Sequence, residues 1–219
     1  MSEQDEPTDR PRRTVRAVPG NDDVNTTTDI TALILDDHER FRRAFAELDE
    51  LQASPNATES ELSQVWDPLA ALLDLHAQAE EEIFYPQLLR RGDDAEEETL
   101  DAVGDHNDIR DAVRDAGQRP VASSGWWESV GKARVANDEH MAEEEREALA
   151  DFRRNSPKEL RESLGRGFLR FKEARPNPED IDSSDRDPEQ YVRDEQQAAA
   201  GTSAGGDSSL GIGGLRGDH

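Results

Sequence analysis

The sequence predicts an all-α protein: an up-down-up-down four-helix bundle with a short additional C-terminal helix and disordered tails. Three observations lead to this fold class. Four long stretches carry apolar residues at helical spacing, and no stretch shows the apolar–polar alternation of a strand. The connections between the four stretches are short enough to join antiparallel neighbours.

The ends of the chain differ in composition from its middle. They are rich in Pro, Gly, Ser and Asp, and such segments bury too little apolar surface to fold alone. We therefore expect a disordered N-terminal tail (1–28), the bundle (29–153), an accessory helix (156–173) and a disordered C-terminal tail (174–219).

The first helix is expected from about Asp29 to Gln52, and Pro55 lies in the turn that ends it. Its apolar residues recur at helical spacing and form one stripe. A histidine, His38, lies within this stripe, whose members are Ile34, His38, Phe41, Phe45 and Leu48.

The second helix has two possible starts. Thr58 and Glu61 have the spacing of a capping box, whereas Asp67 and Pro68 offer a cap followed by a first-turn proline. Pro86 is expected to kink the last turns. Either start directs the same residues inward, namely Leu69, Leu72, Leu73, His76, Glu80 and Ile83.

The third and fourth helices are expected over residues 95–116 and 125–153. Each again carries one histidine on its apolar stripe. The third stripe consists of Thr99, Ala102, Val103, His106, Ile109 and Val113, and the fourth of Trp126, Val130, Ala133, Ala136, His140 and Glu144.

The accessory helix begins with its own start signal. Ser156 is expected to cap it, followed by a first-turn proline, Pro157, and a capping-box glutamate, Glu159. Gly165 and Gly167 weaken this helix, each by roughly 1 kcal/mol relative to alanine.

Composition excludes several classes of function. The 51 acidic residues outnumber the 26 basic ones, and a formal charge of −25 disfavours nucleic acid or an anionic membrane as partner. There is no cysteine, which rules out disulfides and thiolate metal sites. The acidic N-terminus lacks the apolar stretch of a signal peptide, so we expect a soluble, cytoplasmic protein.

The histidines form the strongest pattern in the chain. Four of the five fall one per predicted helix, each on the apolar stripe, and two of them have a glutamate one turn later on the same face. A single histidine on such a face is more often a satisfied core residue, but four together with two glutamates predict a shared site. The six candidate ligands are His38, His76, Glu80, His106, His140 and Glu144.

The chemistry of this set points to a metal pair. Imidazole and carboxylate suit iron, manganese or zinc better than copper(I) or calcium. Six ligands exceed the needs of one tetrahedral zinc, and bridging carboxylates favour two ions roughly 3.5–4 Å apart. No histidine follows a glutamate by three residues, which disfavours the ferritin type of di-iron site.

The pattern H…HxxxE…H…HxxxE resembles the hemerythrin-like family, also called HHE cation-binding domains. The resemblance covers about Asp29 to Arg153 and includes Asp37 before His38 and the Glu-Glu-Ile-Phe-Tyr-Pro wording after His76. It implies a four-helix bundle around a non-haem di-iron centre, with two iron ions bridged by oxo or hydroxo. The four histidines would be iron ligands, and the two glutamates would bridge or cap the metals.

One departure from the family pattern concerns the third helix. Oxygen-carrying members have a second histidine one turn after the third-helix histidine, and this chain has Arg110 there. With both glutamates bridging, roughly ten of the twelve positions of two octahedral metals are filled. Glu81, Asp105, Glu143 or a tyrosine are candidates to fill the gap, but Tyr85 is expected on the opposite face of its helix from His76.

Arg110 itself has two interpretations. It lies one turn from His106 and could pair with Glu80, Glu144 or a bound anion. It could equally extend along the bundle surface with its charged end in water.

A metal centre with about two open coordination positions favours reaction with a bound molecule over reversible carriage of O₂. We expect the protein to bind or decompose peroxide, in the manner of a catalase, or to react with O₂ or NO. The alternative is a module that stores or senses iron, O₂ or NO without turnover. A third hypothesis, a helical scaffold with packed histidines, does not explain why six polar residues converge.

Overall fold

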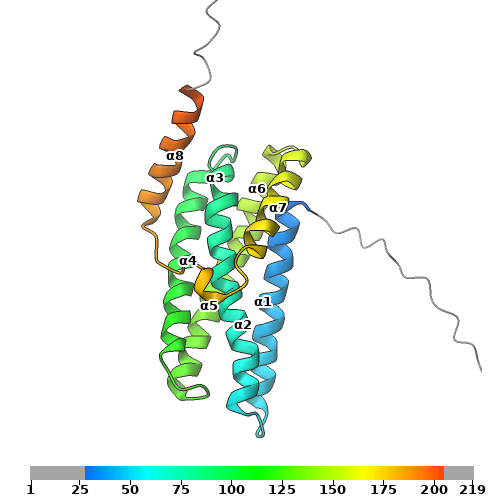
Figure 1. Cartoon of the computed structure of the whole chain (residues 1–219), viewed down its shortest axis with the longest axis vertical. Helices are drawn as coiled ribbons and strands as arrows, with labels where there is room; N and C mark the ends of the chain where they lie inside the picture. Colours follow the sequence, from blue (N-terminus) through cyan, green and yellow to red (C-terminus); the bar gives the residue numbers. More distant parts are fainter. Residues whose placement is uncertain (1–27, 205–219) are drawn as a thin grey trace, which may run out of the picture.

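A computed structural model describes residues 28–204, and every regular element in that range is helical. The four long helices pack in a ring in which α1 contacts α2, α2 contacts α4, α4 contacts α5, and α5 returns to α1. Figure 1 shows them side by side along the long axis, so the predicted four-helix bundle is confirmed. The helices are α1 (Ile30–Ala53), α2 (Glu59–Ala79), α4 (Ala95–Gly117) and α5 (Ser124–Arg146).

Side-chain caps explain where three of these helices begin. Asp29 accepts a hydrogen bond from the Thr31 amide at the start of α1, and Ser123 accepts one from the Trp126 amide at the start of α5. Thr58 forms the expected capping box at the start of α2. The alternative start at Pro68 is wrong, because that proline lies inside α2.

The end of α2 departs from a regular α-helix. Residues Glu80–Phe84 form a π-helical turn, η1, and a short helix, α3 (Tyr85–Leu88), follows it. The expected disturbance at Pro86 is therefore a wide turn just before the proline. Proline lacks the N–H that an α-helix needs, and π turns commonly mark functional sites within helices.

The predicted fourth helix is divided in two. It breaks at Glu147, whose backbone torsions are not helical, and α6 (Ala148–Asn155) continues after the break. The accessory helix, α7 (Lys158–Glu173), forms as expected, but Ser156 does not cap it. Pro157 holds the cap position.

Gly165 permits a close contact between α7 and the start of the bundle. A Cβ atom at this position would lie 1.7 Å from the backbone oxygen of Thr28. The glycine therefore lets α7 lie against the N-terminal end of α1, in addition to weakening the helix. Figure 1 shows α7 beside α1.

The expectation of a disordered tail from residue 174 onward is wrong for residues 174–204. This stretch contains a 3₁₀ turn, η2 (Pro178–Asp180), and a helix, α8 (Pro188–Ala204), which lies along α4 and extends past its end (Figure 1). Contacts with the bundle order a sequence that has too little apolar surface to fold alone. Residues 1–27 and 205–219 lie outside the described residues, and with them most of the predicted N-terminal tail and the end of the C-terminal one.

Two apolar clusters divide the bundle interior. One surrounds Ile34 and Phe84 and includes α6 and α7 residues, and the other surrounds Phe41 and Trp126. His38 lies between Ile34 and Phe41 on α1, so the polar residues are placed between two apolar layers. None of the helices in residues 28–204 is long and apolar enough to cross a membrane.

Candidate metal centre

The structure brings all six candidate ligands into the bundle centre. Every one is buried, with at most 4% of its surface exposed. They form two groups in which one potential ligand atom of each residue lies within 4.8 Å of the others. The four-ligand group is His38, His76, Glu80 and Glu144, and the three-ligand group is Glu80, His106 and His140.

Glu80 belongs to both groups. Its Oε1 lies 3.0 Å from His76 Nε2, and its Oε2 lies 3.4 Å from His106 Nε2. The two oxygens of one carboxylate thus face histidines of different groups. Glu144 belongs to the four-ligand group, with its Oε2 at 3.3 Å from His38 Nε2. This arrangement suits a carboxylate that bridges two cations.

A carboxylate lies behind each of the four histidines. The Nε2 atoms face the other candidate ligands, whereas each Nδ1 atom lies 2.9 to 3.4 Å from an acidic side chain. Such partners set the tautomer and orientation of metal-binding histidines. The pairs are His38–Glu145, His76–Asp37, His106–Glu81 and His140–Asp105.

These acidic residues follow a rule around the bundle. Each one is the sequence neighbour of a candidate ligand and supports the histidine of the next helix: α1 supports α2, η1 supports α4, α4 supports α5, and α5 supports α1. One residue along a helix turns the side chain by roughly 100°. A neighbour of an inward-facing ligand is therefore directed at the adjacent helix.

Glu81, Asp105 and Glu143 do not complete either group of ligands. The first two face histidine Nδ1 atoms, and Glu143 is exposed. Sequence reasoning missed the supporting role of Asp37 and Glu145. An acid directly beside a ligand in sequence is the signal that could have found them.

The comparison with protein families decides what this bundle is. The family model described as "Hemerythrin HHE cation binding domain" matches residues 29–152. The chain belongs to the hemerythrin HHE cation-binding domain family. Comparison with curated proteins and with solved structures finds no match.

The centre has the features that a cation-binding hemerythrin domain needs. Within residues 28–204, ten side-chain atoms are buried without a hydrogen-bond partner, and four of them belong to the four-ligand group: His38 Nε2, His76 Nε2, Glu80 Oε1 and Glu144 Oε2. These four face one another as ion pairs, His38 with Glu144 and His76 with Glu80. Buried polar atoms without partners are costly. A cation among them would receive two imidazole and two carboxylate ligands, so the residues present fit the family's metal.

The buried histidines and carboxylates of this centre shift one another's pKa values. Burial lowers the pKa of His76, but the carboxylates of Glu80 and Asp37 raise it more strongly, to about 10. Burial raises the pKa of Glu80, yet His76 and His106 hold it well below its usual range. A protonated His76 thus neutralises part of the carboxylate charge, and a bound cation would replace its proton.

Tyr85 reaches the hemerythrin centre, contrary to the prediction. Its hydroxyl donates toward Glu80 Oε2 and Glu144 Oε1, each at 3.3 Å. In a regular helix nine residues turn the side chain to the opposite face, but the π turn η1 takes up an extra residue between His76 and Tyr85. Burial and the charges of Glu144 and Glu80 raise the pKa of Tyr85 well above its usual value, so the hydroxyl keeps its proton.

Arg110 is buried, with 1% of its surface exposed. The surface interpretation is therefore wrong. Its Nη2 donates to the Glu81 carboxylate at 2.9 Å rather than to Glu80 or Glu144. The arginine at the position of the missing histidine acts on the carboxylate behind His106.

A pocket opens beside the centre and touches one residue of each ligand group. His140 and Glu144 border it, and the rest of its lining is mostly acidic: Glu98, Asp101, Ala102, Asp105, Glu143, Glu147 and Ala148. It gives the centre a negatively charged approach from the surface between α4 and α5.

Proposed function

We propose that the protein is a non-haem di-iron protein that reacts with or binds peroxide, O₂ or NO, with catalase-like handling of peroxide favoured over reversible O₂ carriage. One iron ion would occupy each ligand group. The observation that carries the proposal is the position of Glu80, whose two oxygens face histidines of the two groups.

The ligand chemistry supports iron. Both groups combine imidazole nitrogen with carboxylate oxygen, a mixture that suits iron and manganese. The carboxylates behind the histidines increase the basicity of the ligands. An oxo or hydroxo bridge between the ions would complete the pair.

The three-ligand group is the proposed reaction side. It contains one ligand fewer than the four-ligand group, and the acidic pocket lies beside its His140. Iron supplies the redox chemistry there when it is bound. Tyr85 holds a proton at its hydroxyl within 3.3 Å of Glu80 and Glu144, where it orients both carboxylates and can donate to a bound ligand.

The alternative is storage or sensing of iron, O₂ or NO without turnover. Burial favours it, because no candidate ligand exposes more than 4% of its surface. A site this deeply buried admits only a small molecule such as O₂ or NO, and the protein can bind such a molecule without converting it.

Metal analysis of the purified chain tests the centre. We expect about two irons per chain, in accordance with a dinuclear carboxylate site. A chain that takes up no metal, or a single zinc, contradicts the di-iron proposal.

Oxygen evolution after addition of peroxide separates turnover from binding. We expect His106→Ala to lower the initial rate per chain by at least roughly tenfold, because it removes a ligand of the reaction side. Glu139→Gln is the matched control, since Glu139 precedes His140 but is exposed. Equal rates for wild type and His106→Ala exclude catalysis at this centre, and an iron-loaded wild type without oxygen evolution supports the alternative.

A further inference from the structure

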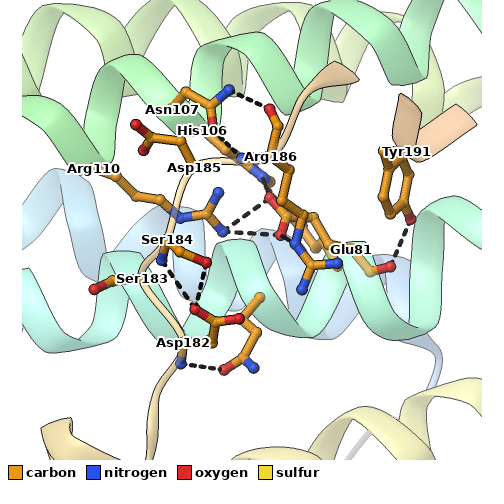
Figure 2. A network of polar contacts seen from close by, with 12 residues as sticks. Glu81, His106, Asn107, Arg110, Asp182, Ser183, Ser184, Asp185, Arg186 and Tyr191 are labelled. Carbon is orange, nitrogen blue, oxygen red and sulfur yellow. Dashed lines mark hydrogen bonds and ion pairs between the residues drawn. The ribbon is translucent and has the colours of Figure 1, made fainter. Parts of the chain in front are cut away.

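Residues 182–191, here called the C-terminal strap, follow the region that the family model matches. They cross the helices that carry the candidate ligands. The strap is anchored by side chains adjacent to candidate ligands. Asn107, next to His106, donates to the Arg186 carbonyl at 2.7 Å and accepts from the Arg186 amide at 2.9 Å. Gln78, two residues before Glu80, accepts from the Asp182 amide at 3.2 Å. Figure 2 shows the strap crossing the helix that carries Glu81 and reaching α4 at Asn107.

The strap reaches the carboxylate of Glu81, which supports His106. Arg186 Nε lies 2.7 Å from Glu81 Oε2, and Arg110 Nη2 donates to the same carboxylate. His106 Nδ1 lies 3.0 Å from Glu81 Oε1. Two guanidinium groups thus fix one buried carboxylate from two sides, as the dashed contacts of Figure 2 show.

The strap also completes the π turn. The Tyr85 amide donates to the carbonyl of Glu80, and Pro86 has no N–H for the carbonyl of Glu81. The Tyr191 hydroxyl donates to that Glu81 carbonyl at 2.6 Å. A buried carbonyl without a donor is costly, so Tyr191 stabilises the turn that directs Glu80, Glu81 and Tyr85.

We propose that Arg186 and Tyr191 are positioning residues for the three-ligand group: Arg186 holds the Glu81 carboxylate against His106, and Tyr191 holds the Glu81 backbone. The strap thereby sets how tightly the three-ligand group holds its iron. The four-ligand group shares Glu80 with the three-ligand group but depends less on the strap, because both of its histidines, His76 and His38, are supported by Asp37 and Glu145 instead. This inference rests on the proposed di-iron function.

Iron release from the loaded full-length chain to ferrozine under reducing conditions tests the proposal. We expect Arg186→Gln to accelerate the release of about one of two irons by up to roughly tenfold, because it frees the Glu81 carboxylate that supports His106. Tyr191→Phe removes one hydrogen bond and should accelerate the same phase roughly twofold to tenfold. Arg186→Lys, which keeps the charge, should restore much of the slow release.

Arg193→Gln is the matched control, because Arg193 on α8 is exposed and contacts Glu189 and Gln190 of its own helix. A Mössbauer spectrum of the loaded Tyr191→Phe chain, with one altered iron doublet, tests the proposal even if Arg186→Gln fails to fold. Wild-type release rates and spectra in both strap variants overturn this inference and leave the di-iron proposal standing. Equal acceleration of both irons also overturns it, since that indicates general loosening. A wild-type chain that holds no iron overturns both proposals.

Discussion

The four-ligand and three-ligand groups share Glu80 but are built from different surroundings. His76 of the four-ligand group has Phe41 and Phe168 at 5.1 and 6.3 Å between ring centroids, so aromatic rings enclose that side. The acidic pocket borders His140 of the three-ligand group and Glu144 of the four-ligand group. The four-ligand group is therefore larger and has aromatic rings around His76, whereas the three-ligand group is smaller.

Each group has one histidine with a buried support and one with a partly exposed support. Glu81, behind His106, has none of its side chain exposed, and Glu145, behind His38, has 29% exposed. Asp37, behind His76, has only 2% of its side chain exposed and also pairs with Lys172 of α7. Asp105, behind His140, is 35% exposed and lies 3.4 Å from its histidine. The comparison teaches that the two groups differ in their number of candidate ligands and in the aromatic enclosure of His76, and that the most exposed of the four supports is the one behind His140.

The largest expected effect comes from the residue that the two groups share. Glu80→Gln removes the bridging charge, and we expect the iron content to fall from about two to well below one per chain. His106→Ala affects the three-ligand group alone and should retain about one iron. Iron analysis after desalting distinguishes the two variants. If Glu80→Gln retains both irons, the groups do not depend on a shared carboxylate.

The next effect compares the outer carboxylates. Asp37→Asn should weaken iron binding by roughly 10–100-fold, because it replaces the carboxylate behind His76 with a neutral amide and removes the charge that pairs with Lys172. Asp105→Asn should weaken it less, since its contact with His140 is longer and more exposed. Competition with a chelator measures both affinities. A stronger effect of Asp105→Asn would show that burial of the supporting carboxylate does not decide its contribution to iron binding.

The smallest expected effect concerns Glu98 at the acidic pocket. Burial, followed by the charges of Asp151, Asp94 and Glu147, raises its pKa from 4.5 to about 7. Because the folded pKa is the higher one, the stability of the fold decreases as the pH rises from 4.5 to about 7 and stays lower above that.

Glu98→Gln should therefore raise the melting temperature at pH 8 and leave it unchanged near pH 4. Glu98 is only half-buried, so screening by solvent limits the gain to under about 1 kcal/mol, which corresponds to at most roughly 2–4 °C. Thermal unfolding at both pH values measures it, with exposed Glu97→Gln as the control. An equal gain at both pH values would show that ionisation is not the cause.

Periodicity was sufficient to predict the bundle and the six candidate ligands. A histidine on the apolar stripe of a bundle helix points into the bundle interior. All four do so, namely His38, His76, His106 and His140. The supporting acids were harder to predict, because their direction depends on which helix is the neighbour. Asp37 precedes His38 in sequence but supports His76.

Local sequence by itself determined where the helices begin and which residues face inward, because caps and apolar spacing act within a few turns. Only the tertiary structure decided the rest. The π turn brought Tyr85 to the centre, and packing on the bundle ordered α8 and the strap, whose residues lack a core of their own. The physical reason is that these features depend on partners about 60 to 110 residues away, such as Glu144 for Tyr85 and Tyr191 for Glu81.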